Sequence, residues 1–255
     1  MDTFSFLFFL TLLTQVGGII WLLSIWFSKL LQKKKRFVFP LIYLVCNLLL
    51  VEPIAKVFGR EALPVFNSEL RPRNLVYPLL FRNYVNPVLK IKLEDSAHAL
   101  FTSHHISITY LDANFPFFDS FPLLPHLSHN DGKKIDISFM YLDSDKKTSN
   151  KKPSISGYGV FVDSDKNPTS NRCLSQGYWQ YDFSKYLTFG TINKLEFDTT
   201  GTRTLILNLL SKPSVKKIFI EPHLKESLGL SDQGKIRFHG CHAIRHDDHI
   251  HLEIK

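Results

Sequence analysis

The chain opens with an uncharged apolar segment that only a lipid bilayer or a deep protein core can accommodate. Residues 3–28 read TFSFLFFLTLLTQVGGIIWLLSIWFS and contain no Asp, Glu, Lys or Arg. At a helical rise of ~1.5 Å per residue, a helix of this length exceeds the ~30 Å hydrocarbon core of a membrane. The chain starts Met1-Asp2 and reaches Lys29 without the basic start and small-residue cleavage site of a secretory signal peptide. We therefore predict a retained transmembrane helix over residues 3–28.

A second apolar segment follows a short basic turn. The turn is KKKR at 33–36, and the segment covers about residues 37–58, with no charged residue before Glu52. Because positively charged loops stay in the cytoplasm, a hairpin of two spans would place both termini outside the cytoplasmic membrane. The alternative is a buried or interfacial helix, since the uncharged run is short for a span. The sequence thus predicts a membrane anchor over residues 1–60.

The positive charge of the chain is concentrated around this anchor. The net charge is +8, and the first 60 residues carry seven Lys or Arg against Asp2 and Glu52, which accounts for +5 of it. The rest is spread thinly, with no basic stripe interleaved with aromatic residues. Membrane topology and lipid headgroups explain the basic run, so no nucleic-acid partner is expected.

Two of the three cysteines fall in the part of the chain predicted to be exported. Cys46 lies in the second apolar segment, whereas Cys173 and Cys241 come later. An extracytoplasmic location permits a disulfide between the latter two. Two free thiols, or Cys241 as a metal ligand beside the histidines, are the alternatives.

The remainder of the chain predicts one α+β domain with a mixed or antiparallel sheet and flanking helices. Helices are predicted at TRTLILNLLSK (202–212) and HLKESLGL (223–230). The strands and helices alternate without a regular β-α-β rhythm. We assign residues 61–103 to a connecting region and 104–255 to the domain. Short apolar or alternating runs predict strands at 89–93, 106–111, 134–142, 157–163, 194–198, 215–222, 235–238 and 249–254.

Histidines gather at the C-terminal end. Five of the eleven lie within residues 239–251. In the predicted strand HIHLEI (249–254) the isoleucines and the leucine share one face, and His249 and His251 lie on the other. Residues two apart on a strand face are ~6.5 Å apart at the backbone, so both imidazoles can serve one small site. His246 lies one short turn upstream and can reach the same space.

A second group of polar residues supplies complementary ligands. His129 precedes the turn-forming sequence Asn-Asp-Gly, and Asp136 lies in a strand whose opposite face is apolar. If the chain reverses at that turn, His129 and Asp136 face one another with Cβ atoms ~5 Å apart. Two histidines and an aspartate suit zinc, and three protein ligands leave a fourth position for water. Taken singly, Asp136 is also explained as a surface strand residue and His129 as a loop histidine.

These residues resemble a known family. The pattern H-x6-D with a glycine three after the histidine, followed by H-x2-H-x-H, resembles the penicillin-insensitive murein endopeptidases. These are a branch of the LAS group of zinc peptidases, which also includes lysostaphin-type enzymes, D-Ala-D-Ala peptidases and the hedgehog signalling domain. The stretch at 209–228 is also similar to that branch, and the resemblance covers about residues 104–255. The motif residues are His129, Gly132, Asp136, His246, His249 and His251.

The resemblance implies a zinc peptidase with a LAS-like fold that hydrolyses peptide cross-links of peptidoglycan. It would act on the outer, periplasmic side of a bacterial cytoplasmic membrane. It implies zinc ligands at His129, Asp136 and His251, and active-site roles for His246 and His249. His249 would move the proton of a zinc-activated water to the leaving amine, and His246 would stabilise the charged intermediate.

Neighbouring residues have more than one interpretation. Asp247 and Asp248 either orient the catalytic imidazoles or are simple turn carboxylates. His126, His239 and His242 are predicted to be structural or to lie on the rim of the site. Two other functions remain as alternatives: a zinc-stabilised binding module of the hedgehog type that cuts nothing, and a zinc peptidase that acts on proteins.

Overall fold

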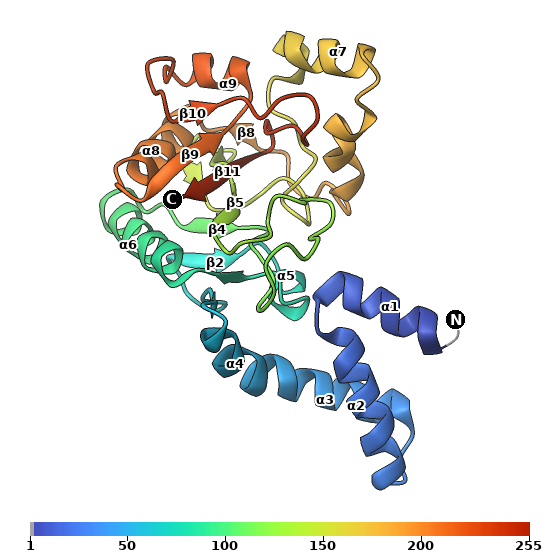
Figure 1. The fold of residues 1–255 in the computed structure, drawn as a ribbon. Coiled ribbons are helices and arrows are strands. Elements are labelled where there is room, and N and C mark those ends of the chain that lie inside the picture. Colours follow the sequence, from blue (N-terminus) through green and yellow to red (C-terminus); the bar gives the residue numbers. More distant parts are fainter. Residues whose placement is uncertain (1–2) are drawn as a thin grey trace.

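A mixed six-stranded sheet forms the centre of the molecule, as the α+β prediction requires (Figure 1). The computed structural model describes residues 3–255, apart from the side chain of Lys166. The strand order is β10-β9-β11-β5-β4-β2; β11 runs antiparallel to both β9 and β5, while the edge pairs β10-β9 and β2-β4 are parallel. The strands are β2 (Leu70–Pro72), β4 (Ile108–Tyr110), β5 (Lys134–Ser138), β9 (Val215–Phe219), β10 (Ile236–Arg237) and β11 (His249–Ile254).

Two helices cover one face of this sheet and build the main core. They are α6 (Pro87–His104) and α8 (Thr199–Leu210), which lie side by side in Figure 1. The side chains of Asn86 and Asp198 cap them by accepting hydrogen bonds from backbone N–H groups in the first turn. Each fully buried Leu or Ile contributes about 1.5–3 kcal/mol. The helices bury Leu89, Leu93, Ala97, Leu100, Leu205, Ile206 and Leu209 against Ile135, Ile137, Ile218, Ile250, Leu252 and Ile254.

Shorter elements surround the sheet. A three-stranded sheet consists of β6 (Tyr141–Leu142), β7 (Thr148–Ser149) and β8 (Glu196–Phe197), and a two-stranded one of β1 (Glu61–Ala62) and β3 (Tyr84–Val85). The remaining short helices are α5 (Val76–Leu79), α7 (Pro168–Ser175), α9 (Pro222–Ser227), and the 3-10 helices η2 (Ser164–Lys166) and η3 (Trp179–Leu187). The helix η3 forms one wall of the functional cleft described below.

The second apolar segment forms one long helix. It consists of α3 (Lys35–Val45), the π-helical turn η1 (Cys46–Leu50) and α4 (Val51–Val57). Together they make 23 residues, within which an 18-residue window has a mean hydropathy of 2.1, so the helix is long and apolar enough to cross a membrane. The break between α3 and α4 is a single π-turn, which leaves the helix continuous.

The first apolar segment is not the single helix predicted over residues 3–28. It is divided into α1 (Thr3–Thr14) and α2 (Gly17–Leu30), and neither is long enough to span a bilayer. The chain turns at Gln15, whose φ is 66°. This left-handed conformation is stabilised because the Gln15 side chain accepts a hydrogen bond from the Phe117 N–H (2.8 Å) and donates one to the Phe118 carbonyl (3.3 Å). Long-range contacts therefore override the local helical preference.

Three further expectations differ from the structure. The run at 89–93, predicted as a strand, lies in α6, because Leu89, Leu93 and Ala97 follow a four-residue repeat that faces the core. The run at 157–163 forms turns and contains no strand. Residues 61–103 supply β2 and α6, so this segment is integral to the sheet and its core instead of connecting two parts.

Candidate metal centre

The pairing of β5 with β11 brings two of the three predicted ligands, Asp136 and His251, together. In this antiparallel pair His251 lies opposite Asp136, and His249 lies opposite Ser138. Directly opposed residues project from the same face of a sheet. The expectation that His129 would be the cross-strand neighbour of Asp136 is wrong, because His251 takes that place. His129 reaches the cluster from the loop that precedes β5.

The three predicted ligands converge on one point. The Nε2 atom of His129 lies 3.0 Å from Nδ1 of His251 and 3.2 Å from Oδ1 of Asp136, and the last two atoms are 3.0 Å apart. Zinc binds N and O ligands at ~2.0–2.2 Å, so ligand atoms at the corners of a tetrahedron lie ~3.3–3.5 Å apart. The spacing of these three atoms is close to one face of such a tetrahedron. The group can hold a metal ion.

Hydrogen bonds behind the ligands orient them toward this point. Nδ1 of His129 donates to the carbonyl oxygen of Ala113 at 2.7 Å. Because a carbonyl only accepts, the proton of the neutral imidazole lies on Nδ1 and the lone pair of Nε2 faces the cluster. The hydroxyl of Tyr158 donates to Oδ2 of Asp136 at 2.7 Å, which leaves Oδ1 directed at the histidines.

The charge states of the ligands suit a cation. Burial alone would raise the pKa of Asp136, but the imidazoles of His129, His249 and His126 hold that pKa well below its usual range. Burial lowers the pKa of His251 to about 3. At neutral pH the site therefore offers an ionised carboxylate and a neutral imidazole, the forms that bind metals.

His126, predicted to be structural or on the rim, belongs to the buried cluster. Its Nδ1 lies 3.1 Å from Oδ2 of Asp136 and 3.1 Å from Oδ2 of Asp112. With Asp136 and His249 it forms a second group that can hold a metal ion. In this group, however, Oδ2 of Asp136 already accepts from Tyr158 and Nδ1 of His126 lies against two carboxylates, which leaves only the Nε2 atoms of the two imidazoles without a hydrogen-bond partner within residues 3–255. The His129, Asp136 and His251 group is therefore the stronger candidate.

His249 lies beside the ligands with one nitrogen held and one available. Nδ1 of His249 donates to Oδ1 of Asp248, and the other oxygen of Asp248 accepts from the N–H of Gly159 at 2.6 Å. Burial opposes a charge on this imidazole, but Asp136 and Asp248 outweigh it and raise its pKa to about 9. Its Nε2 lies 3.6 Å from Oδ2 of Asp136. Nε2 of His249 is buried without a hydrogen-bond partner within residues 3–255.

The two aspartates beside His249 have different roles. Asp248 positions the His249 imidazole, which is one of the two interpretations considered above. Asp247 instead forms a buried ion pair with Arg245, whose Nε donates at 2.6 Å. Asp247 also accepts a hydrogen bond from the Asn167 side chain at 3.2 Å, so it ties the backbone beside the histidines to its surroundings.

His246 faces both the ligands and the solvent-accessible cleft. Its ring centre lies 4.9 Å from that of His249 and 5.5 Å from that of His251. Burial, together with the neighbouring imidazoles, lowers the pKa of His246 well below its usual value, so this ring is neutral at pH 7. His239 stacks on Phe219 with ring centres 4.1 Å apart and borders the cleft described below.

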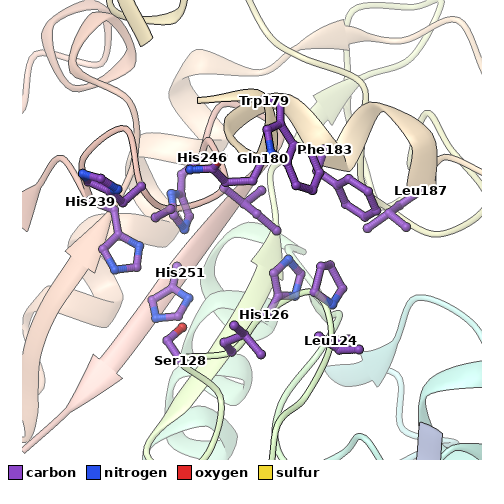
Figure 2. A pocket seen from close by; sticks show the side chains of 15 residues that line it. Leu124, His126, Ser128, Trp179, Gln180, Phe183, Leu187, His239, His246 and His251 are labelled. Atoms are coloured by element: carbon purple, nitrogen blue, oxygen red, sulfur yellow. The ribbon is translucent and has the colours of Figure 1, made fainter. Parts of the chain in front are cut away.

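A cleft of about 710 Å³ opens above the cluster (Figure 2). The imidazoles of His239, His246, His251 and His126 border it, whereas the other two ligands, His129 and Asp136, are fully buried behind them. Figure 2 shows η3 with its aromatic side chains across the opening from the histidines. The remaining lining residues are Leu124, Pro125, Leu127, Ser128, Trp179, Gln180, Phe183, Leu187, His242, Ala243 and Ile244.

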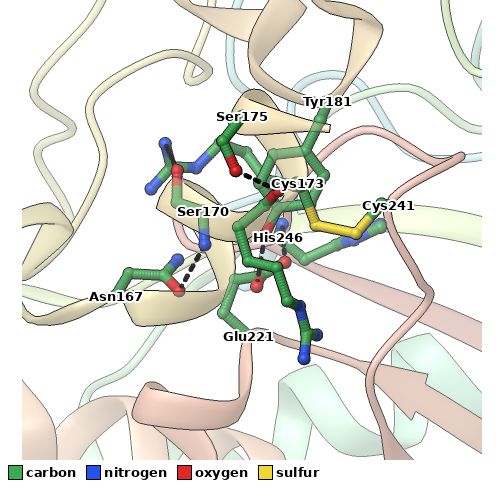
Figure 3. The surroundings of a disulfide bond; sticks show 10 residues. Asn167, Ser170, Cys173, Ser175, Tyr181, Glu221, Cys241 and His246 are labelled. Atoms are coloured by element: carbon green, nitrogen blue, oxygen red, sulfur yellow. Dashed lines mark hydrogen bonds between the residues drawn. A yellow bond between two sulfur atoms is a disulfide. The ribbon is translucent and has the colours of Figure 1, made fainter. Parts of the chain in front are cut away.

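A disulfide links α7, which precedes η3 in the chain, to the loop that leads to His246 (Figure 3). Cys173 on α7 is bonded to Cys241 in the loop that leads to His246, with Cα atoms 5.2 Å apart. Of the alternatives considered for these cysteines, the structure shows the disulfide, and Cys241 is not a metal ligand. Disulfides are typical of extracytoplasmic proteins.

Several residues of the site carry no signal in the sequence. Tyr158, Asp112 and Arg82 lie far from the histidine motifs in the chain, and no spacing rule connects them to the cluster. Arg82 forms an ion pair with Asp112 and donates a hydrogen bond to its Oδ2 at 3.1 Å, and Asp112 in turn contacts His126. His126 could have been included, because it stands three residues before His129 in the same short loop.

Comparison with known proteins adds no further support to the resemblance described above. No protein-family model matches the chain, and no curated protein matches it. The functional assignment therefore depends on the buried histidine and aspartate cluster and on the cleft above it.

Proposed function

We propose that this chain is a membrane-anchored, zinc-dependent peptidase that acts outside the cytoplasm. The observation that carries the proposal is the convergence of two imidazole nitrogens and one carboxylate oxygen within 3.2 Å of one another. Two further imidazoles, His249 and His246, lie beside these ligands without being needed as ligands. A site that only stabilised the fold would not require them.

The donor set fits zinc. Histidine nitrogen and aspartate oxygen are ordinary zinc ligands, and three protein ligands with a cleft on one side match catalytic sites instead of closed structural ones. When bound there, zinc would supply Lewis-acid polarisation of a carbonyl group and of a water molecule. Within residues 3–255 the Nε2 atoms of His249 and His251 are buried without hydrogen-bond partners, which is consistent with a site that takes up further polar groups.

His249 is positioned to transfer a proton. Asp248 holds its Nδ1–H, so its Nε2 can accept a proton from an attacking water and return it to the leaving amine. Asp136 contributes to the raised pKa of His249. Neutralising that carboxylate with a cation would bring the pKa back toward the range of a general base. His246 is neutral, and it can donate a hydrogen bond to the negative charge that develops on the carbonyl oxygen.

The membrane location and the substrate class are part of the proposal. The apolar helix Lys35–Val57 and the disulfide support attachment to the outer face of a bacterial cytoplasmic membrane. Peptide cross-links of peptidoglycan are the substrate class implied by the resemblance to murein endopeptidases. The binding-module alternative is disfavoured because His246 and His249 border the centre without being needed to hold a metal.

The test uses the full chain in detergent micelles. Metal analysis should find about one zinc per chain. His249→Ala should keep the zinc and lose ~10²–10⁴-fold in the hydrolysis of cross-linked muropeptides or of peptides, because proton transfer is removed. His129→Ala should lose the zinc as well. His98→Ala, which changes an exposed histidine, is the matched control.

The outcomes separate the alternatives. If His249→Ala digests the substrates as well as the wild type, the assignment of His249 is wrong. If the zinc-loaded wild type binds muropeptides and cuts neither them nor peptides, the binding module replaces the peptidase. Mass spectrometry of the products identifies the bond that is cut.

A further inference from the structure

We propose that the cleft above the metal centre is a subsite for a large apolar side chain of the peptide substrate. The inference rests on the proposed peptidase function and specifies its substrate class. It favours peptides or proteins that carry an aromatic or long aliphatic residue close to the scissile bond. Peptides with only methyl or carboxylate side chains, as in most peptidoglycan cross-links, would be poorer substrates, so the inference favours the peptidase acting on proteins that was named above as an alternative.

The walls of the cleft are apolar on three sides. The first wall is the loop with Leu124, Pro125 and Leu127, the second is the face of η3 with Trp179, Phe183 and Leu187, and the third is formed by Ala243 and Ile244. No Asp, Glu, Lys or Arg occurs among the described residues that line it. A carboxylate side chain against these walls would lose its hydration without meeting a Lys or Arg side chain among the described residues, which is unfavourable.

Large side chains on facing walls are left in contact with water. Trp179 is 71% exposed, Leu127 58% and Leu124 49%. Covering apolar surface gains ~25 cal/mol per Å², so a ligand that fills the space between these side chains gains binding energy from each. The only ring contact of Trp179 among the described residues is with Phe183, at 6.1 Å between ring centres. The core of the protein therefore does not account for its position.

The cleft lies where a side chain next to the scissile bond would fall. His126, His246 and His251 border it, so a peptide whose carbonyl reaches the metal centre must pass through this space. Its volume of about 710 Å³ is within the range of pockets that enclose a sizeable ligand. A methyl side chain would leave most of that volume unfilled, whereas a phenyl or isobutyl group can contact both walls.

The subsite is held open by contacts within the protein. The Cys173–Cys241 disulfide joins α7, which leads into η3, to the loop with Ala243 and Ile244. Within η3 the backbone carbonyl of Tyr181 accepts from the Arg245 N–H at 2.8 Å. Because the walls are fixed before a ligand arrives, little ordering free energy is lost on binding.

The experiment measures side-chain preference with otherwise identical peptides. Zinc-loaded full-length protein in detergent is given blocked pentapeptides of alanine in which one position, scanned along the chain, is Phe, Leu, Ala or Asp. We expect kcat/KM for the best Phe or Leu peptide to exceed that of the all-alanine peptide by ~10–100-fold, with the Asp peptides lowest. Equal rates for all peptides would overturn the subsite and leave the peptidase proposal intact.

Variants of the wall test which residues make the preference. Trp179→Ala should reduce the preference for Phe over Ala ~10-fold or more, while Trp179→Phe should retain most of it. Phe189→Ala, an exposed aromatic residue outside the cleft, is the control. An unchanged preference in Trp179→Ala would contradict the assignment of this wall.

A binding measurement separates the subsite from the chemistry. Calorimetric titration of zinc-loaded His249→Ala with the Phe and Asp peptides does not require turnover. Tighter binding of the Phe peptide would support the subsite even if the wild type cut nothing. Equal affinities would refute the subsite whether or not the wild type is a peptidase.

Discussion

Buried charged residues around the metal centre each have a defined partner. Asp136 is held by Tyr158, Asp248 by Gly159 and His249, and Asp247 by Arg245. A buried charge without such a partner would be strongly unfavourable. The network therefore explains how so many ionisable groups can be buried within one small region.

Glu221 is the buried carboxyl group of this region that predicts a pH effect on stability. Its Oε2 accepts from the Tyr181 hydroxyl at 2.5 Å, and its Oε1 accepts from the His246 N–H at 3.1 Å (Figure 3). Burial raises its pKa from 4.5 to about 7. Between these values the folded protein keeps a proton that the unfolded chain has released, so the free energy of unfolding falls as pH rises through this window.

We expect the loss between pH 4.5 and 7.5 to be about 3 kcal/mol from this group. Glu221→Gln, which cannot ionise, should remove that part of the pH dependence. The check is the difference in free energy of unfolding between wild type and variant at pH 5 and pH 8, with chelator present throughout. The same difference at both pH values would mean that Glu221 does not titrate in this range. Glu226→Gln, an exposed residue of the helix α9 that Glu221 immediately precedes, is the control.

At the level of elements, the loop between β4 and β5 links the N-terminal helices to the metal centre. It carries His126 and His129, and the turn between α1 and α2 holds its middle through Gln15. Phe58 at the end of α4 packs on Phe117 with ring centres 5.1 Å apart. Close to the ligand end of the loop, Gly132 has a φ of 75° and lies against the Arg60 side chain.

Gln15→Ala should therefore disturb the metal site from a distance. It removes the two part-buried hydrogen bonds of Gln15 to the Phe117 N–H and the Phe118 carbonyl, each worth ~0.5–1.5 kcal/mol. We expect faster hydrogen exchange in residues 115–130 and a weaker zinc affinity by chelator competition. Gln32→Ala, in an exposed turn, is the matched control. Unchanged exchange and zinc affinity in Gln15→Ala would show that the helices do not support the loop.

At the level of the whole molecule, the N-terminal helices and the domain share a hydrophobic cluster. The Tyr43 hydroxyl donates to the Leu79 carbonyl at 2.6 Å, and Asn47 donates to that of Pro78 at 2.9 Å, so the domain contacts the long apolar helix along its middle. The opposite side of this helix exposes large apolar residues. The cluster contains Val16, Ile20, Cys46, Val51, Ala55, Phe81 and Tyr84.

A fragment that begins at residue 61 should consequently behave poorly. It would expose Phe81 and Tyr84, which are 0% and 3% exposed in the full chain. We expect the fragment to self-associate and to unfold at a lower temperature than the full chain in detergent. Size-exclusion chromatography and thermal unfolding provide the check. A monomeric fragment with unchanged thermal stability would show that residues 1–60 are a separable anchor.

The sequence by itself determined the local features of this protein. Alternation in HIHLEI placed Ile250, Leu252 and Ile254 on the core face and His249 and His251 on the other, because side chains alternate along a strand. The capped, apolar stretch at 202–212 correctly predicted most of α8, and the α+β class is confirmed. Such features depend on residues close together in the chain.

Only the tertiary structure decided which distant residues meet. Asp136 lies opposite His251 because β5 and β11 pair across more than 100 intervening residues, and the sequence wrongly favoured His129 for that position. The break at Gln15, the burial of His126 and the Cys173–Cys241 bond also depend on segments far apart in the chain. No local pattern encodes these contacts, since each is fixed by how the faces of separate elements pack together.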